Sequence, residues 1–163
     1  MDTAELIRRA TAAGITIATA ESCTGGMIAA ALTDIPGSSA VVDRGFVTYS
    51  NAAKMQMLGV RAETLDAVGA VSEEVAAEMA EGAVRNAGVT IAVSVTGIAG
   101  PGGSEFKPEG RVCFGLARDR QKTITETVEF GAIGRDKVRT AARDRALELL
   151  AQAISQIERE TGS

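Results

Sequence analysis

Apolar residues recur along this chain in blocks of two kinds, one with helical spacing and one with the continuous or alternating pattern of strands. In the first block, Leu6, Ala10 and Ala13 fall on one helical face, and Gly14 ends the pattern. The same reasoning predicts helices over residues 3–13, 24–33, 51–58, 61–69, 72–88 and 134–159. It predicts strands over 15–20, 40–50, 89–97, 111–119 and 122–130, the second with an interruption near Gly45.

The order of these elements indicates the fold. Strands and helices alternate up to the continuous apolar strand 89–97, which is typical of the middle of a parallel sheet, and the last two strands form a hairpin. We therefore expect an α/β fold, with a mixed, mostly parallel sheet between helices, in one domain over 1–163. In such sheets ligands bind beyond the carboxyl ends of the parallel strands, which here means the loops 21–26, 50–54 and 96–103.

Composition narrows the possible functions. The 163 residues are 45% apolar but only 3% aromatic, and the net charge is −4, which argues against a nucleic-acid partner. No apolar run approaches the length of a membrane span, and the amphipathic start does not resemble a signal peptide. Two cysteines, Cys23 and Cys113, lack CxxC spacing and indicate reduced thiols in a cytoplasmic protein.

The absence of histidine is the most restrictive feature of the composition. It excludes Ser-His-Asp triads, Cys-His dyads and every His-ligated metal site. A hydrolase with this sequence would use Lys, Tyr, Asp, Glu or metal-bound water as its base. We expect no cofactor and no metal site, since the acidic residues form no compact cluster near the three loops beyond Glu21.

The first loop, with the sequence ESCTGG over 21–26, places Ser22 between a strand and a helix. Free backbone N–H groups at such a turn can stabilise an oxyanion or hold a phosphate, and glycines let a ligand approach. Ser22 is therefore either a nucleophile or merely a helix cap. Cys23 is the alternative nucleophile, but without a histidine to activate it we expect a small core residue.

The second loop contains Tyr49, the only tyrosine of the chain, and Lys54. Ser50 or Asn51 is expected to cap a helix, so that the helix dipole and burial would both lower the pKa of Lys54. Such a lysine can act as a general base for a serine hydroxyl, whereas the alternative is a solvated surface lysine. Tyr49 is either a proton relay or substrate contact, or simply an aromatic residue at the sheet edge.

The third loop, 98–110, is the segment richest in glycine and proline. Its start resembles a phosphate-binding loop, but it contains neither the Lys-Ser/Thr of a Walker loop nor G-x-G-x-x-G. Long glycine-rich loops within a compact domain are more often functional than not, the alternative being a flexible connection. Lys107 and Arg111 could serve an anion, and one arginine from the basic start of the last helix could reach the site.

Taken together, these segments resemble the C-terminal domain of CinA, the competence/damage-inducible protein. The resemblance covers residues 3–159 and rests on AESCTGG, GFVTYSNAAK, GAVSEEVAAEMAEGA and VTGIAGPGGS with KPEG, in that order. It implies a three-layer α/β/α fold whose five-stranded sheet has the order 2-1-3-4-5, with strand 4 antiparallel. Stand-alone members resemble the nicotinamide mononucleotide deamidase of NAD salvage. A metal-independent amidohydrolase that releases ammonia and nicotinate mononucleotide is therefore implied.

The resemblance also implies roles for individual residues. Ser22 would be the nucleophile, with Lys54 and Tyr49 as the base. Substrate contacts are expected from Glu21, Cys23, Thr24, Gly25, Gly26, Thr96, Gly97, Ala99, Gly100 and Arg139. One departure is Glu109, which stands where the family usually has valine. Because a carboxylate would repel a phosphate, Glu109 is expected to point outward.

Other functions stay open at this point. The chain could be a non-catalytic nucleotide-binding or regulatory module of the same fold, or a phosphohydrolase that uses carboxylate-bound Mg²⁺. A nucleic-acid role is the least supported, given the charge. The expected partners are a small pyridine nucleotide and a second copy of the chain in a symmetric dimer, with no nucleic acid and no membrane.

Overall fold

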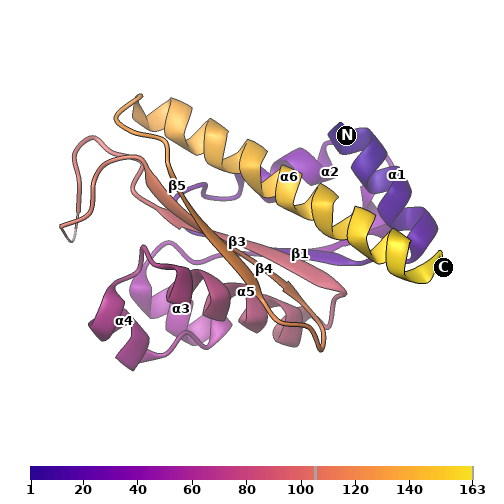
Figure 1. Cartoon of the computed structure of the whole chain (residues 1–163), viewed down its shortest axis with the longest axis horizontal. Helices are drawn as coiled ribbons and strands as arrows, with labels where there is room; N and C mark the ends of the chain where they lie inside the picture. The colour runs from indigo at the N-terminus through magenta and orange to yellow at the C-terminus, as the bar shows by residue number, and fades with distance from the viewer. Residues whose placement is uncertain (105, 163) are drawn as a thin grey trace.

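The computed structural model of the chain describes residues 1–104 and 106–162. A five-stranded sheet of order β2-β1-β3-β4-β5 lies between two helical layers (Figure 1). β1 pairs in parallel with β2 and β3, whereas β4 is antiparallel to both of its neighbours, so the predicted three-layer fold, strand order and antiparallel fourth strand are confirmed. The strands are β1 (Ile17–Glu21), β2 (Val42–Val47), β3 (Ile91–Gly97), β4 (Arg111–Arg118) and β5 (Ile124–Glu129).

Helices α1, α2 and α6 cover one face of the sheet, and α3, α4 and α5 cover the other (Figure 1). Within the described residues, no helix is both long enough and apolar enough to cross a membrane. The helices are α1 (Thr3–Ala13), α2 (Met27–Thr33), α3 (Asn51–Leu58), α4 (Ala62–Val68), α5 (Glu73–Ala87) and α6 (Arg135–Thr161), with a 3-10 turn at Ser38–Ala40.

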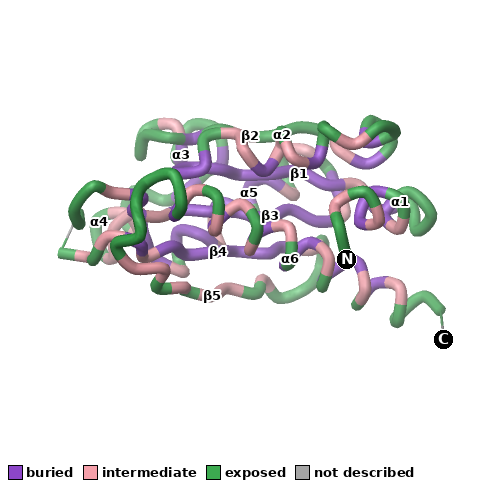
Figure 2. The backbone as a smooth tube through the Cα atoms, turned by 90° about the horizontal axis from the view of Figure 1, so that it is seen from above, coloured by how far each residue is buried: buried purple, intermediate pink, exposed green. Residues whose placement is uncertain are grey.

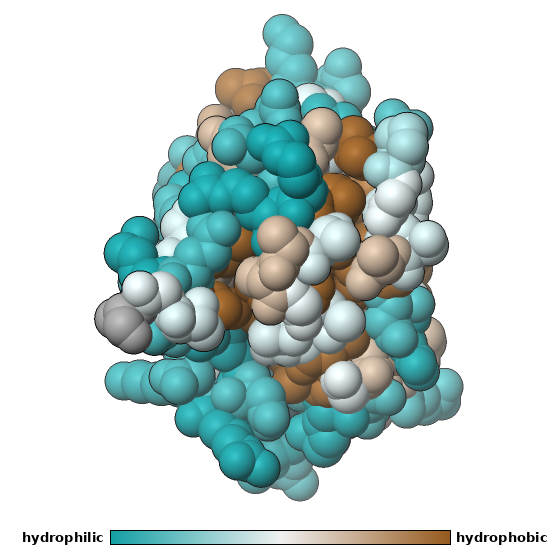
Figure 3. All heavy atoms as spheres, turned by 90° about the vertical axis from the view of Figure 1, so that its right-hand side faces the viewer, coloured by the Kyte–Doolittle hydropathy of each residue, from teal (hydrophilic) through white to brown (hydrophobic). Residues whose placement is uncertain are grey.

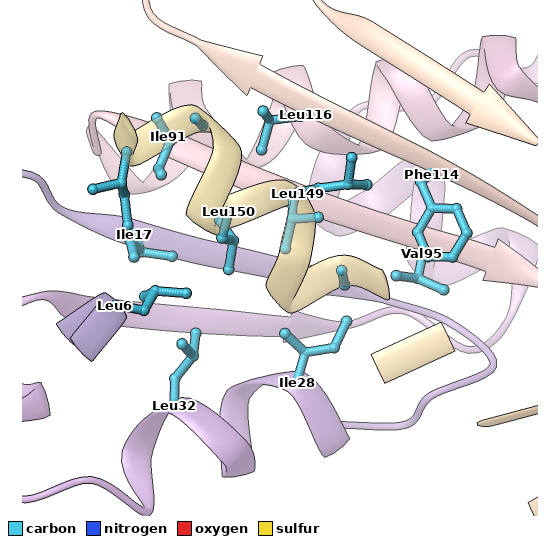
Figure 4. Packing of buried hydrophobic residues seen from close by; sticks show 14 of the residues in the cluster. Leu6, Ile17, Ile28, Leu32, Ile91, Val95, Phe114, Leu116, Leu149 and Leu150 are labelled. Atoms are coloured by element: carbon cyan, nitrogen blue, oxygen red, sulfur yellow. The ribbon is translucent and has the colours of Figure 1, made fainter. Parts of the chain in front are cut away.

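The core is aliphatic, as the scarcity of aromatic residues requires. Figure 2 shows that the central strands are buried, whereas the edge strands β2 and β5 are partly exposed. The larger cluster joins Ile17 and Ile91 of the sheet to Leu6 and Leu150 of the helices above it (Figure 4). Because burying one such side chain contributes about 1.5–3 kcal/mol, this layer anchors α6 firmly across the sheet.

The two ends of the molecule differ in character. The end that carries both chain termini is covered mainly by hydrophilic side chains around a small apolar centre (Figure 3). The glycine-rich loop projects at the opposite end, where α6 begins (Figure 1). That end is formed by the carboxyl ends of the parallel strands.

The second helix begins later than predicted, at Met27 rather than Thr24. Residues 22–26 form a tight turn in which Gly25 and Gly26 have φ angles of 57° and 106°. Neither angle occurs in a right-handed helix, and both strongly favour glycine. Ser22 therefore does not cap α2 but lies in the turn that precedes it.

Two smaller expectations are also corrected. The predicted interruption of β2 is present, but the shift in register with β1 falls at Asp43, two residues before Gly45. Gly45 is in register with Thr19, and a Cβ there would come within 2.7 Å of Thr19 Oγ1, so this position admits only glycine. In α1 the buried face includes Ile7, whereas Ala13 is exposed, because the helix turns Ile7 towards the sheet.

Candidate active site

A pocket opens at the carboxyl ends of β1, β2 and β3, the edge of the sheet at which the sequence predicts a ligand site. Its volume is about 320 Å³, and all three predicted loops contribute to its wall. The predicted site residues that line it are Ser22, Cys23, Tyr49, Lys54, Thr96, Gly97, Ala99 and Gly100. The other predicted contacts are not among the lining residues: Thr24, Gly25 and Gly26 belong to the turn that carries Ser22, and Glu21 and Arg139 hold that turn in place.

Lys54 is buried in the pocket wall, with only 1% of its surface exposed. Ser50 caps α3 by accepting a hydrogen bond from the N–H of Ala53 at 3.0 Å, and Lys54 consequently falls in the first turn of this helix. From there its Nζ lies 3.0 Å from Ser22 Oγ. Two side chains that are 32 positions apart in the sequence therefore meet, and Lys54 is not a solvated surface lysine.

The Nζ of Lys54 also donates to the backbone carbonyl oxygens of Thr48, at 3.0 Å, and Tyr49, at 3.3 Å. A carbonyl oxygen can only accept, so each of these contacts requires an N–H from Nζ. A neutral amine that gives both of its N–H bonds to these carbonyls directs its lone pair towards the third partner, Ser22. The geometry thus suits a base that receives the hydroxyl proton of Ser22.

The turn that carries Ser22 is built around the carboxylate of Glu21, which is fully buried. Its Oε1 accepts hydrogen bonds from Thr24 Oγ1 at 2.6 Å and from the N–H of Ile28 at 3.0 Å and of Gly26 at 3.2 Å. Its Oε2 accepts from the N–H of Ala29 at 3.0 Å. Glu21 thus satisfies the free N–H groups at the start of α2 and interacts favourably with the helix dipole.

Arg139 also holds this turn in place, through hydrogen bonds to its carbonyl oxygens. Its Nε donates to the carbonyl oxygen of Cys23 at 3.0 Å, and its Nη2 donates to that of Thr24 at 3.3 Å. The guanidinium packs against Gly25, where a Cβ would come within 3.4 Å of Nη2. Arg139 therefore positions the main chain next to Ser22 and reaches the pocket only through it.

The backbone N–H groups of the turn divide into engaged and free donors. The N–H of Gly25 donates to the carbonyl oxygen of Ser22 at 3.0 Å, and that of Gly26 is held by Glu21. Within the described residues, no backbone acceptor is found for the N–H of Cys23 or Thr24. Cys23 lines the pocket whereas Thr24 is fully buried, so the N–H of Cys23 is the better placed oxyanion donor.

Tyr49 stands at the mouth of the pocket with 60% of its surface exposed. Its hydroxyl accepts a hydrogen bond from Nη2 of Arg135 at 2.9 Å, and Nη1 of the same guanidinium donates to the carbonyl oxygen of Gly100 at 2.6 Å. Tyr49 contacts Lys54 through its backbone carbonyl. Tyr49, Arg135 and Gly100 thus form a connected rim across the mouth.

The glycine-rich wall of the pocket is tied to the connection between α4 and α5. Thr96 Oγ1 donates to the carbonyl oxygen of Ala70 at 2.9 Å. Nζ of Lys107 donates to the carbonyl oxygens of Val68 at 2.5 Å and of Val71 at 2.6 Å. Lys107 therefore anchors the loop.

Glu109 does not point outward as expected. Its Oε1 accepts a hydrogen bond from the N–H of Gly102 at 2.5 Å, and its carboxylate packs against Gly100. The loop folds back on itself, so the side chain is directed to the inner side of the turn. Arg111, a second expected anion contact, pairs instead with Glu129 across the hairpin.

These features agree with comparisons to known proteins. A profile of the CinA C-terminal domain matches residues 2–154. The chain belongs to this family. A nicotinamide-nucleotide amidohydrolase, PncC, from Escherichia coli strain K12 is 56% identical over 146 residues, which cover 89% of this chain and 88% of that protein.

Other family members are longer or have solved structures. A CinA-like protein from Chlorobium phaeobacteroides is also 56% identical over 146 residues, covering 86% of this chain but 34% of that protein. The chain thus spans about a third of the length of that relative. The crystal structure of a competence/damage-inducible protein from Agrobacterium tumefaciens has a TM-score of 0.87 and 49% identity, covering 95% of this chain and 96% of that one.

The family resemblance did not reveal every residue of the pocket. Arg135, Asn51, Ala70 and Val71 line it but were not predicted as contacts. The basic start of the last helix had indicated that an arginine could reach the site, and Arg135 is that residue. No sequence pattern had indicated that the α4–α5 connection, with Ala70 and Val71, would line the pocket. Within the part of the chain that the structure describes, no group of three or more potential metal-ligating residues is found.

A variant of Cys23 tests whether this thiol, rather than the hydroxyl of Ser22, is the nucleophile. The thiol is 5% exposed, and desolvation by burial raises its pKa to about 11, with smaller opposing contributions from its own backbone N–H, Arg139 and Lys54. We expect the thiol to stay protonated at neutral pH and to be a poor nucleophile. Cys23→Ala should therefore retain activity within about fivefold, because only a small apolar contact is lost.

The accompanying measurement is alkylation of wild-type protein by iodoacetamide at pH 8, with labelled sites identified by mass spectrometry. Slow labelling of Cys23, and turnover by Cys23→Ala within about fivefold of wild type, are expected. A thousandfold loss of activity in that variant would identify the thiol as the reacting group instead.

Proposed function

We propose that this chain is a nicotinamide mononucleotide amidohydrolase that uses Ser22 as its nucleophile and Lys54 as its base. The observation that carries the proposal is the 3.0 Å contact between Ser22 Oγ and Lys54 Nζ, buried in a pocket at the carboxyl edge of the sheet. The relatives named PncC, at 56% identity over most of both chains, support the choice of substrate.

The proposed reaction begins with transfer of the Ser22 hydroxyl proton to the neutral Nζ of Lys54. Burial and the N-terminal end of α3 both disfavour the ammonium form of this lysine before the reaction starts. Ser22 Oγ attacks the carboxamide carbon, and the N–H of Cys23 stabilises the oxyanion that forms. Lys54 returns the proton to the departing ammonia.

The second half of the reaction releases the acid. Water attacks the acyl-enzyme ester and gives a proton to Lys54, and Ser22 Oγ leaves with that proton restored. The products are nicotinate mononucleotide and ammonia. The Thr48 and Tyr49 carbonyls hold Nζ in place through both steps, so the base need not reorient between them.

The rim of the pocket suits the rest of the substrate. The ring of Tyr49 offers an exposed aromatic surface to the cationic pyridinium, an arrangement that favours cation–π attraction. Arg135, held between Tyr49 and Gly100, brings a guanidinium to the same rim, where it can pair with a phosphate. We propose Arg135, in place of Arg139, as the basic residue nearest the phosphate.

The direct test is incubation of the purified chain with nicotinamide mononucleotide, with and without EDTA. Stoichiometric release of ammonia and nicotinate mononucleotide is expected, at a rate that the chelator leaves unchanged, because Lys54 requires no metal ion to act as the base. Chromatography of the products and an ammonia assay provide the two readouts.

Each rival function predicts a different result in the same assay. Release of inorganic phosphate that EDTA abolishes would indicate a phosphohydrolase. Tight nucleotide binding with no product of either kind would indicate a non-catalytic module. Either result would overturn the amidohydrolase proposal.

A further inference from the structure

The carboxylate of Glu109 occupies an unusual position for a pocket proposed to hold a phosphorylated substrate. It lies against the inner side of the glycine-rich loop, half-buried, with Oε1 at 2.5 Å from the N–H of Gly102. A Cβ at Gly100 would come within 2.3 Å of this oxygen, so the carboxylate fits only because residue 100 is glycine. Gly100 and Gly102 both line the pocket, which places the charge directly behind its wall.

Among the residues that the structure describes, no cation forms an ion pair with the carboxylate of Glu109. The nearest guanidinium on the rim, that of Arg135, donates to the carbonyl oxygen of Gly100 and to the hydroxyl of Tyr49. The described charges of the loop are those of Glu109 and Lys107, and Nζ of Lys107 is turned to the carbonyl oxygens of Val68 and Val71. The charge that lies against Gly100 and Gly102 is therefore the carboxylate of Glu109.

The same contact removes a donor from the loop. Glycine-rich loops bind phosphates through free backbone N–H groups, and a carboxylate that accepts such an N–H takes the place of the ligand. With Gly102 engaged, a phosphate at this wall would gain no bond from that N–H and would meet a like charge. On the rim of the mouth, the guanidinium of Arg135, which donates to the carbonyl oxygen of Gly100 and to the hydroxyl of Tyr49, offers the complementary charge.

We propose that Glu109 is a specificity-determining residue, which weakens the binding of a phosphorylated pyridine nucleotide relative to its unphosphorylated riboside and directs the phosphate towards Arg135. This inference rests on the proposed function, since it concerns the substrate of the same pocket.

The test compares two ligands that contain no amide, nicotinate mononucleotide and nicotinic acid riboside, so binding can be measured whether or not the chain is an amidohydrolase. Their dissociation constants are determined by calorimetry for wild type, Glu109→Gln, Glu109→Val and Glu5→Gln. Glutamine retains an oxygen for Gly102 but removes the charge. Glu5 lies on α1, at the end of the molecule away from the loop, and controls for net charge (Figure 1).

For Glu109→Gln we expect the nucleotide to bind about fivefold more tightly, as loss of one like charge at close range predicts, and the riboside to change less than twofold. Glu5→Gln should affect neither ligand. Glu109→Val, which also removes the acceptor, should weaken both ligands relative to Glu109→Gln, and the difference between the two variants reports the hydrogen bond.

Equal changes for both ligands in Glu109→Gln, or no change for the nucleotide, would overturn the proposal and leave Glu109 a loop-shaping residue only. Ammonia release from nicotinamide mononucleotide by wild type is measured in parallel. If that activity is missing while the ligand-specific effect of Glu109→Gln is present, the amidohydrolase proposal fails and the specificity role stands. If neither ligand binds to wild type, both proposals fail.

Discussion

Ser22→Ala and Lys54→Met should each lower kcat for ammonia release from nicotinamide mononucleotide by about four orders of magnitude, which is typical of losing one member of a nucleophile–base pair. Alanine removes the attacking oxygen. Methionine keeps much of the apolar volume of Lys54 but leaves Ser22 Oγ without the base that lies 3.0 Å from it. Binding of the nucleotide should change little, since the substrate's remote groups meet the rim.

The double variant provides the sharper test. Because both side chains act on one proton transfer, Ser22→Ala combined with Lys54→Met should be no slower than either single variant within about threefold. Lys122→Met is the matched control, since Lys122 is exposed between β4 and β5 and should retain full activity. Additive losses in the double variant would mean that the two residues act in separate steps, and substantial turnover by Ser22→Ala would remove it from the reaction.

Glu21→Gln should destabilise the protein by about 3 kcal/mol, the range expected when a buried, fully bonded carboxylate loses its acceptor capacity. The carboxylate accepts bonds from Thr24 Oγ1 and from three backbone N–H groups at the start of α2. A glutamine side chain would turn an NH₂ group towards at least one of these donors. The turn that holds Ser22 should loosen with the helix.

Urea denaturation followed by circular dichroism measures this loss as a lower midpoint with an unchanged slope. Glu74→Gln is the matched control, because Glu74 is an exposed acid in the first turn of α5 and should shift stability by no more than about 0.5 kcal/mol. If Glu21→Gln proved as mild as Glu74→Gln, the hydrogen bonds around this carboxylate would not be what stabilises the turn.

Local signals in the sequence predicted the elements of the sheet, whereas its strand order and the pairing of Ser22 with Lys54, 32 positions apart, were implied by the family resemblance. Strand and helix patterns gave the element order, and N-capping at Ser50 placed Lys54 in the first turn of its helix. The start of α2 was predicted three residues too early, since helical propensity alone does not reveal that Glu21 supplies the acceptors from within the preceding strand.

Local sequence patterns do not show whether Arg135 or Arg139 reaches the pocket. The two residues are four positions apart, so they lie on the same face of α6 with a stagger of about 6 Å along its axis. Which of them reaches the pocket depends on how far α6 slides across the sheet. The position of α6 along the sheet is set by the packing of Val138, Ala142 and Ala146 in the core.

The direction of Glu109 was missed for a similar reason. Its side chain follows a loop whose return path is defined by the bridge between Ser104 and Lys107 and by the anchoring of Lys107 to Val68 and Val71. These contacts join segments that are up to 39 positions apart. No pattern within the loop itself indicates on which side of the chain the carboxylate will lie.

Helix α6 has a practical consequence for experiments on this protein. Its 27 residues span about 40 Å, from Arg135 at the pocket to Thr161 at the far end of the sheet. Side-chain pairs such as Arg9 with Glu158 hold that far end in place. A fluorophore or affinity label attached after Thr161 would therefore lie well clear of the pocket mouth. Labelled or immobilised protein should still admit a nucleotide to the pocket.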